Sequence, residues 1–336
     1  MKLRNLALRW ETFLLLVLAV VLLLGAQASD HFLTASNISI ALAGMMPVAI
    51  VALPMTLIIV TGEIDISVGS IIGLCASIMG LCLEHHLPVG LAMASGLAIG
   101  TLAGLFNGVM VVVFGLPSLV VTIGTLALYR GLAQIILKER GVNSFPDWYQ
   151  EIGFGTIGDT PIPWSVIVFA ALFLGFAFFL HLTHGGRAIY AIGNNRDAAR
   201  YSGVSVQHSI LAVFVASGMV CAVAAIVLTA YLASARSDTA IGLELQVITA
   251  VVLGGVNIFG GSGTLVGVLI ALFVLAFVKN ALGLVGMTPE QQDIVTGAVL
   301  VGTLIIFGAS RNVGEARSWF ARLRINRPEG RSSRFR

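Results

Sequence analysis

Two acidic residues interrupt an otherwise apolar stretch in the first quarter of the chain. Segment 61–70 reads TGEIDISVGS and contains Glu63 and Asp65. Carboxylates inside apolar segments commonly mark a transport pathway, because their burial is costly unless they meet a partner or water. Pro47 and Pro54 precede them, and proline removes a helical hydrogen bond, so we expect the preceding helix to bend or break. The alternative is that both carboxylates lie in a short wetted loop at a membrane interface.

Three further polar side chains are candidates for the same pathway. Ser67 follows the acidic pair, Asn107 lies late in a long apolar run, and Asn257 is the most deeply placed amide of a later run. A buried Asn needs hydrogen-bond partners, which a water-lined pathway supplies. We therefore predict a translocation path lined by four residues: Asp65, Ser67, Asn107 and Asn257.

A glycine stripe accompanies Asn107. Gly96, Gly100, Gly104 and Gly108 recur at intervals of four residues. This spacing places all four on one helix face, where a neighbouring helix can pack against bare backbone. We interpret the stripe as a helix packing surface.

A polar loop at 183–207 carries its own helical pattern. Three side chains in it can cap a short helix: Asn194, Asn195 and Asp197. The helix then covers about 196–202 and ends at Gly203. Arg196 and Arg200 fall on one side of it, at a spacing of four residues. A plain connector would be shorter, so we expect this helix to dock a cytoplasmic partner.

Catalytic motifs are absent from the sequence. None of the three lysines follows Gly or precedes Ser or Thr, so the chain lacks the phosphate-binding loop of ATPases, and HExxH and GxSxG motifs are missing too. The five glycines between 254 and 263 have no neighbouring lysine and are typical of a turn. Cys75, Cys82 and Cys221 lie in apolar runs without a CxxC pair. We predict a chain without enzymatic activity, metal or cofactor.

The composition requires elements that lie in a membrane. Hydrophobic residues make up 57% of the chain and charged residues only 10%, against about 25% in soluble domains. The excess must face lipid or other buried helices, and the long continuous runs exclude the alternating strands of a membrane barrel. We predict an all-α polytopic protein with ten transmembrane helices: 11–28, 39–60, 66–84, 88–113, 117–137, 164–182, 208–233, 244–258, 262–284 and 291–309. The eighth is short, which is typical of a broken or re-entrant span.

Positive charge sets the expected orientation. With the N-terminus inside, fourteen of the nineteen Lys and Arg residues lie in cytoplasmic segments, eight of them in the tail 311–336. We expect both termini in the cytoplasm, one transmembrane domain over 1–310, a basic tail over 311–336, and no nucleic-acid partner. Ten spans divide into two halves of five, which must then be inverted. Asn107 and Asn280, each late in its span, are a weak sign of such a repeat.

These motifs together resemble a known family. The chain resembles the permease subunits of binding-protein-dependent sugar ABC importers, in the ribose, autoinducer-2 and rhamnose branch, over about 40–310. The matching motifs, in order, are TGEIDISVGS (61–70), GLFNGVMV (104–111), LPSLVVTIGTLALYRGLA (116–133), GRAIYAIGNNRDAARYSGV (186–204) and AVVLGGVNIFGGSGTLVG (250–267). ARSD (235–238) is most similar to autoinducer-2 and rhamnose members. Relatives often have two glycines before Ile-Asp, whereas this chain has Gly62 and Glu63.

The resemblance implies a fold similar to the type II importers and a set of partners. It implies a second permease subunit, identical or paralogous, two ATP-binding subunits that hold the nucleotide, and a periplasmic sugar-binding protein that sets most of the specificity, all at a bacterial inner membrane in contact with membrane lipid. The path itself would bind sugar weakly. The loop 183–207 becomes the coupling loop, with five candidate contact residues: Arg187, Asn194, Asp197, Arg200 and Tyr201.

Two other functions compete with an ABC permease. A self-contained secondary transporter or facilitator would move solute without a partner, but ion-driven transporters usually keep several ionisable residues within their spans. Here Arg130 is nearly the only one. A membrane-bound scaffold or enzyme subunit would carry no solute, and the missing catalytic motifs argue against an enzyme.

Overall fold

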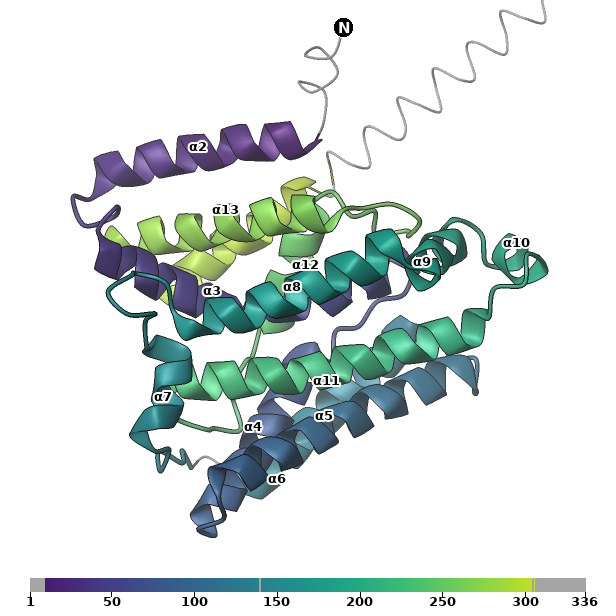
Figure 1. The fold of residues 1–336 in the computed structure, drawn as a ribbon, viewed down its shortest axis with the longest axis horizontal. Coiled ribbons are helices and arrows are strands. Elements are labelled where there is room, and N and C mark those ends of the chain that lie inside the picture. Colours follow the sequence, from purple (N-terminus) through teal and green to yellow (C-terminus); the bar gives the residue numbers. More distant parts are fainter. Residues whose placement is uncertain (1–9, 139, 304, 306–336) are drawn as a thin grey trace, which may run out of the picture.

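The computed structural model describes residues 10–138, 140–303 and 305, and these residues fold into a bundle of helices (Figure 1). Seven helices are long and apolar enough to cross a bilayer: α2 (Trp10–Ala28), α3 (Ala35–Val60), α5 (Val89–Val112), α6 (Ser118–Leu137), α8 (Trp164–Leu182), α11 (Val206–Leu232) and α13 (Leu265–Leu284). Shorter apolar helices are α4 (Val68–Glu84) and α12 (Leu243–Leu253), and residues 289–303 are helical. The predicted all-helical membrane fold is confirmed.

Three short helices complete the described part of the chain. They are α7 (Asp147–Phe154), α9 (His184–Asn194) and α10 (Arg196–Tyr201). Only α10 was expected from the sequence, and α9 is an additional amphipathic helix in the same loop. The predicted eighth span, 244–258, is helical only as α12, whose 11 residues extend about 16 Å. That length is about half the thickness of a bilayer core.

The connections gather at two ends of the bundle. We call one the α10 end; it contains the α3–α4 segment (61–67), the α9–α10 segment (183–205) and the glycine segment (254–264). The other is the α7 end, and it contains α7 and the α11–α12 loop (233–242). The tail 311–336 and the basic residues before Trp10 lie outside the described residues.

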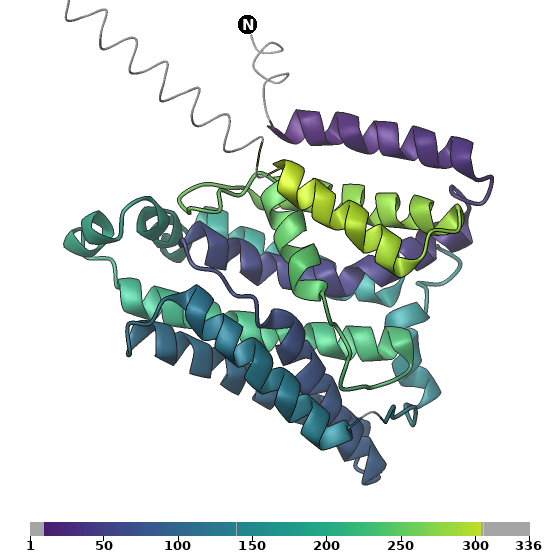
Figure 2. The ribbon, with the colours of Figure 1, turned by 180° about the vertical axis from the view of Figure 1, so that it is seen from behind.

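Helix α3 forms the centre of the bundle. Almost all of its last sixteen residues are buried, and it packs against α8, α11, α12 and α13. The sequence predicted that Pro47 and Pro54 would bend or break it. The helix is not broken, because it continues through both prolines and ends at Thr61. Figure 2 shows the helical residues 289–303 on the side opposite to α8.

The glycine stripe lies where α5 and α11 come closest. A methyl group added at Gly100 would lie 2.7 Å from Ala222 Cβ, and one added at Gly104 would lie 2.9 Å from Gly218 Cα. Gly108 faces Leu211 and Phe214 of the same helix, whereas Gly96 faces Met79 of α4. Three of the four glycines therefore let α11 approach the α5 backbone directly.

The two sets of five spans are closely interleaved. Helix α11, from the second set, packs on α3, α4 and α5 of the first, and α13 packs on α2 and α3. Asn107 and Asn280, the pair that hinted at a repeat, have different surroundings, since Asn280 exchanges hydrogen bonds with Asn37 at 2.8 and 3.0 Å. An inverted relation between the halves stays a prediction.

Candidate functional site

Three of the four residues predicted for the path meet in one buried polar cluster. Asp65 Oδ1 accepts hydrogen bonds from the Ser67 backbone N–H at 2.9 Å and from Ser67 Oγ at 2.6 Å. Asn107 Nδ2 donates to Ser67 Oγ at 2.8 Å. Tyr129 OH contacts Asn107 Oδ1 at 3.1 Å and donates to the Ala103 carbonyl at 3.0 Å. We call Asp65, Ser67, Asn107 and Tyr129 the buried polar cluster.

This cluster joins the α3–α4 segment to α5 and α6. Asp65, Ser67 and Asn107 are fully buried, and Glu63 is only 5% exposed. Asp65 Oδ2 has no hydrogen-bond partner among the described residues. The hydrogen bonds of the cluster hold the backbone that precedes α4 against α5 and α6.

Asn257 lies apart from the cluster, in the glycine segment. Its side-chain oxygen accepts from the Phe259 backbone N–H at 3.1 Å, and its backbone bonds Ser262 and Gly260 at 3.0 and 2.8 Å. These contacts shape a tight turn, in which Gly260 and Gly261 adopt positive φ angles of 89° and 80°. The structure therefore gives Asn257 a turn-forming position at the α10 end.

The α9–α10 segment is fastened to the α3–α4 segment by charge. Arg196, the first residue of α10, forms an ion pair with the nearly buried Glu63 and contacts the Thr61 carbonyl at 3.5 Å. Asn195 caps α10 by accepting the Ala198 N–H at 2.9 Å, and Gly203 follows it with a φ of 84°. The predicted short helix is present, but Arg196 is turned inward toward Glu63.

Asn194 and Tyr190 fasten the same segment to the glycine segment. Asn194 Nδ2 donates to the Gly261 carbonyl at 3.3 Å, and Tyr190 OH donates to the Gly263 carbonyl at 2.8 Å. Gly261 N–H in turn donates to the Val60 carbonyl at the end of α3, at 2.9 Å. The α9–α10 segment, the end of α3 and the start of α13 are thus held together at one point.

Four other residues predicted for coupling remain on the surface of this segment. The side chains of Arg187, Asp197, Arg200 and Tyr201 are exposed, and Tyr201 is 91% exposed. An aromatic ring beside charged groups on an exposed short helix is typical of a protein contact. Their contact with a partner stays a prediction, and the amide of Asn194, which is also exposed, bonds within the chain.

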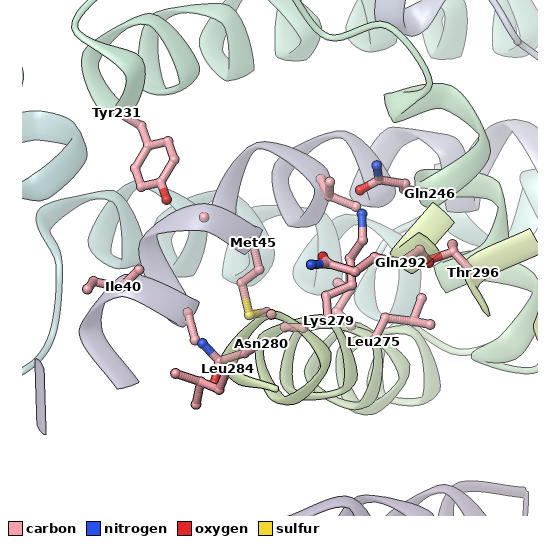
Figure 3. A pocket seen from close by; sticks show the side chains of 16 residues that line it. Ile40, Met45, Tyr231, Gln246, Leu275, Lys279, Asn280, Leu284, Gln292 and Thr296 are labelled. Carbon is pink, nitrogen blue, oxygen red and sulfur yellow. The ribbon is translucent and has the colours of Figure 1, made fainter. Parts of the chain in front are cut away.

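A cavity of about 400 Å³ lies between α3, α11, α12, α13 and the helical residues 289–303 (Figure 3). Six polar side chains contribute to its lining: Tyr231, Gln246, Lys279, Asn280, Gln292 and Thr296. Figure 3 shows Gln246, Gln292 and Lys279 directed toward a common space. Lys279 Nζ also lies 3.3 Å from Asp293 Oδ1. The amides and hydroxyls of this cavity can bind solute hydroxyl groups by hydrogen bonds.

Sequence reasoning did not place these residues together. They come from four helices, so no spacing within one helix connects them. One usable signal was present, because Gln292 and Thr296 are four residues apart in the last span and share a helix face. The sequence indicated Asn280 only as a weak sign of an internal repeat, and it did not indicate a place in a cavity.

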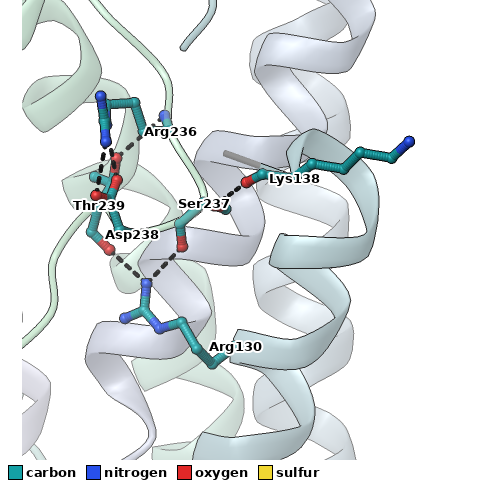
Figure 4. A network of polar contacts seen from close by, with 6 residues as sticks. All are labelled: Arg130, Lys138, Arg236, Ser237, Asp238 and Thr239. Carbon is teal, nitrogen blue, oxygen red and sulfur yellow. Dashed lines mark hydrogen bonds and ion pairs between the residues drawn. The ribbon is translucent and has the colours of Figure 1, made fainter. Parts of the chain in front are cut away.

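Arg130, an ionisable residue within the predicted span 117–137, supports the α7 end (Figure 4). Its Nη1 donates to the carbonyls of Ser237 and Thr239 at 2.8 and 2.9 Å, and its Nη2 to that of Gly69 at 3.3 Å. In the same loop Arg236 binds both Asp238 carboxylate oxygens, at 2.8 and 2.9 Å, and lowers the pKa of that carboxyl. Arg130 therefore fixes the α11–α12 loop over α4.

Comparison with known proteins places this chain in a family. The family of branched-chain amino acid transport system permease components matches residues 37–304. Three relatives are autoinducer 2 import system permease proteins LsrD. The one from Enterobacter sp. (strain 638) is 36% identical over 93% of this chain and 95% of its own. Those from Photorhabdus temperata and Escherichia coli (strain K12) are each 33% identical, over 94% and 95% of this chain and 96% and 98% of their own.

No solved structure matches the chain at a significant level. The family match covers more than three quarters of the sequence, including both polar segments at the α10 end and every helix that lines the cavity. This chain belongs to the family described as branched-chain amino acid transport system permease components.

Proposed function

We propose that this chain is the membrane-spanning subunit of an ATP-driven importer that moves a sugar-like solute into the cytoplasm of a bacterium. Its LsrD relatives are named as permeases of autoinducer 2 import systems. Separate ATP-binding subunits supply the energy, a second permease subunit completes the pathway, and a solute-binding protein delivers the cargo. The nucleotide is held by those ATP-binding subunits.

The α10 end faces the cytoplasm in this proposal. The α9–α10 segment contains Arg187, Arg196 and Arg200, and the basic tail follows the last helix. Lys and Arg are retained on the cytoplasmic side of bacterial membrane proteins. Both termini are then cytoplasmic, and the α7 end faces the solute-binding protein.

The cavity of Figure 3 is the solute site of this proposal. It is lined by residues from the halves of α3 and α13 that lie toward the α7 end, so solute arrives from outside. Gln246 and Gln292 offer both donors and acceptors, a chemistry that suits a neutral solute with several hydroxyl groups. The buried polar cluster lies toward the α10 end and acts as part of the inner closure.

The observation that carries the proposal is the construction of the α9–α10 segment. It exposes Arg200 and Tyr201 on one side, and it holds the ends of α3 and α13 through Arg196, Asn194 and Tyr190 on the other. A force applied by a partner to α10 therefore acts directly on helices that line the cavity. Such an arrangement serves a transporter that is driven from outside the chain.

Pull-down from native membranes tests the proposal. The solubilised chain should recover an ATP-binding subunit, and a variant carrying Arg200→Glu and Tyr201→Ala should lose it. Arg140→Glu, an exposed arginine at the α7 end, is the matched control and should retain it. Recovery of solute flux by the chain alone in liposomes with an ion gradient, without any ATPase, would instead support a self-contained transporter.

A further inference from the structure

Two acids of the α3–α4 segment are buried, but only one of them has a cation. Glu63 is paired with Arg196. Asp65 lies two residues later, has no exposed surface and forms no ion pair with any of the described residues. The two acids therefore differ in the one partner that compensates a buried negative charge.

The helices around Asp65 offer it no cation. Helices α3, α4, α5, α6 and α11 contain a single Lys or Arg, which is Arg130. The guanidinium of Arg130 binds three backbone carbonyls instead. Two titratable groups interact electrostatically with Asp65, namely Tyr129 of α6 and Cys221 of α11. Neither side chain can carry a positive charge in either protonation state, and α3 and α5 have no titratable side chain.

The hydrogen bonds of Asp65 satisfy only one of its two oxygens. Oδ1 accepts from the Ser67 backbone N–H at 2.9 Å and from Ser67 Oγ at 2.6 Å, and both donors are uncharged. Oδ2 is buried and has no partner among the described residues. A carboxylic acid has one acceptor-only oxygen and one O–H group, whereas an ionised carboxylate needs donors on both oxygens. The observed bonds match a carbonyl oxygen at Oδ1 and an O–H group at Oδ2.

Burial favours the same assignment. An isolated ionised carboxylate costs far more to bury than a neutral polar group, so a buried acid without a cation takes up a proton. We propose that Asp65 is a proton-binding site, and that in this conformation it holds the proton on Oδ2 as a carboxylic acid. Glu63 stays ionised beside Arg196, so the α3–α4 segment carries one negative charge instead of two. Neutral hydrogen bonds alone then hold the buried polar cluster together.

The bound proton has a consequence for import, which rests on the proposed function, whereas the bound proton itself does not. When the inner closure opens, water reaches the cluster. Asp65 then gives its proton to that water, because a hydrated Asp carboxyl is ionised at neutral pH. The carboxylate takes one proton back from water when the cluster forms again. Each opening and closing of the path thereby releases and rebinds one proton.

Two isosteric variants in the same segment test the site. Asp65→Asn replaces the carboxyl by a neutral amide whose oxygen can still accept both Ser67 donors. Glu63→Gln is the matched control, because it makes the same chemical change on a buried acid that has a cation. The wild type and both variants are purified in detergent at neutral pH, and infrared spectra are recorded. A protonated carboxyl has a C=O stretching band that is separate from the bands of a carboxylate.

The wild type should show this band at neutral pH, well above the pH of about 4 at which a free Asp carboxyl loses its proton. The band should persist in Glu63→Gln, and its intensity should fall by the equivalent of one carboxyl in Asp65→Asn. A band of equal intensity in the wild type and Asp65→Asn would overturn the proposal, because Asp65 would then be ionised.

Thermal unfolding of the same proteins gives a second, independent measurement. Asp65→Asn should shift the melting temperature by about 2 °C or less, since an amide resembles the neutral acid, whereas Asp65→Ala should lower it by about 4 °C or more. An Asp65→Asn protein that fails to fold, or that melts as low as Asp65→Ala, would contradict a neutral Asp65.

Discussion

Glu63 and Arg196 lie 133 positions apart in the sequence and form an ion pair between the α3–α4 segment and the first residue of α10. The Glu63 side chain is 6% exposed and that of Arg196 is 49% exposed. Position 63 is also where this chain has an acid in place of the second glycine frequent in the family it resembles. The pair therefore gives this permease an electrostatic connection between its surface segment and its central helix.

Removal of the two partners of this pair should have unequal effects. Arg196→Gln leaves a buried carboxylate without its cation and should cost about 1–3 kcal/mol, less than a fully buried pair because Arg196 is half exposed. Glu63→Gln leaves only a neutral amide and should cost less. Thermal unfolding in detergent measures both. The exposed pair Glu84–Arg140 is the control, and its Arg140→Gln variant should change stability by about 1 kcal/mol or less.

The same variants should separate ATP hydrolysis from transport. With the Glu63–Arg196 link gone, α10 can move with its partner while the α3–α4 segment lags behind. We expect Glu63→Gln to keep the ATPase activity of the assembled importer and to lower solute uptake per ATP. The double variant Glu63→Arg with Arg196→Glu should recover part of the uptake. Unchanged uptake per ATP in all variants would show that the pair is structural alone.

The buried polar cluster should be destabilised by loss of its shared hydroxyl. Ser67→Ala removes the group that bonds both Asp65 and Asn107, so two buried polar side chains lose a partner. We expect a loss of about 1–3 kcal/mol. Tyr129→Phe should cost about 1 kcal/mol, since a single hydroxyl is lost. A double-mutant cycle of the two in thermal unfolding should be non-additive, and strict additivity would contradict a connected cluster.

The close approach of α5 and α11 should not tolerate a methyl group. Gly104→Ala directs a Cβ at the Phe214 carbonyl and the Gly218 backbone and should cost about 1–3 kcal/mol by overpacking. Gly131→Ala on α6 is the control, because its Cβ meets nothing within 4 Å, and it should be neutral or slightly stabilising. Expression level and melting temperature in detergent report the difference. Equal behaviour of the two variants would contradict the described packing.

The amides of the cavity should affect solute affinity more than assembly. Gln246→Leu and Gln292→Leu each remove one or two hydrogen bonds to solute, worth about 0.5–1.5 kcal/mol apiece, so the concentration for half-maximal uptake should rise about 2- to 12-fold. Pull-down of the ATP-binding subunit should be unaffected. Val301→Ala, an exposed apolar position on the last helix, serves as the control. Unchanged uptake in both leucine variants would exclude this cavity from the path.

The sequence predicted the elements better than their contacts. Each of the ten apolar runs contains a helix within the described residues, because continuous hydrophobicity over a span length leaves few alternatives. The cap at Asn195 and the glycine stripe could be predicted because they depend on spacing within one helix. The Glu63–Arg196 pair and the cavity could not be predicted, since they join segments that are far apart in the chain. The possible break at Pro47 and Pro54 does not occur. Helix α3, which is tightly buried there, is continuous through both prolines.

The contact between α5 and α11 restricts how this protein can change shape. Gly100, Gly104 and Gly218 meet backbone to backbone, and the side chains of Phe214 and Ala222 face the same contact. Sliding one helix along the other by about 1.5 Å would press these side chains against the facing backbone. We therefore expect α5 and α11 to move together as one rigid pair. In the proposed transport cycle the change of shape would then occur where α3, α12 and α13 enclose the cavity.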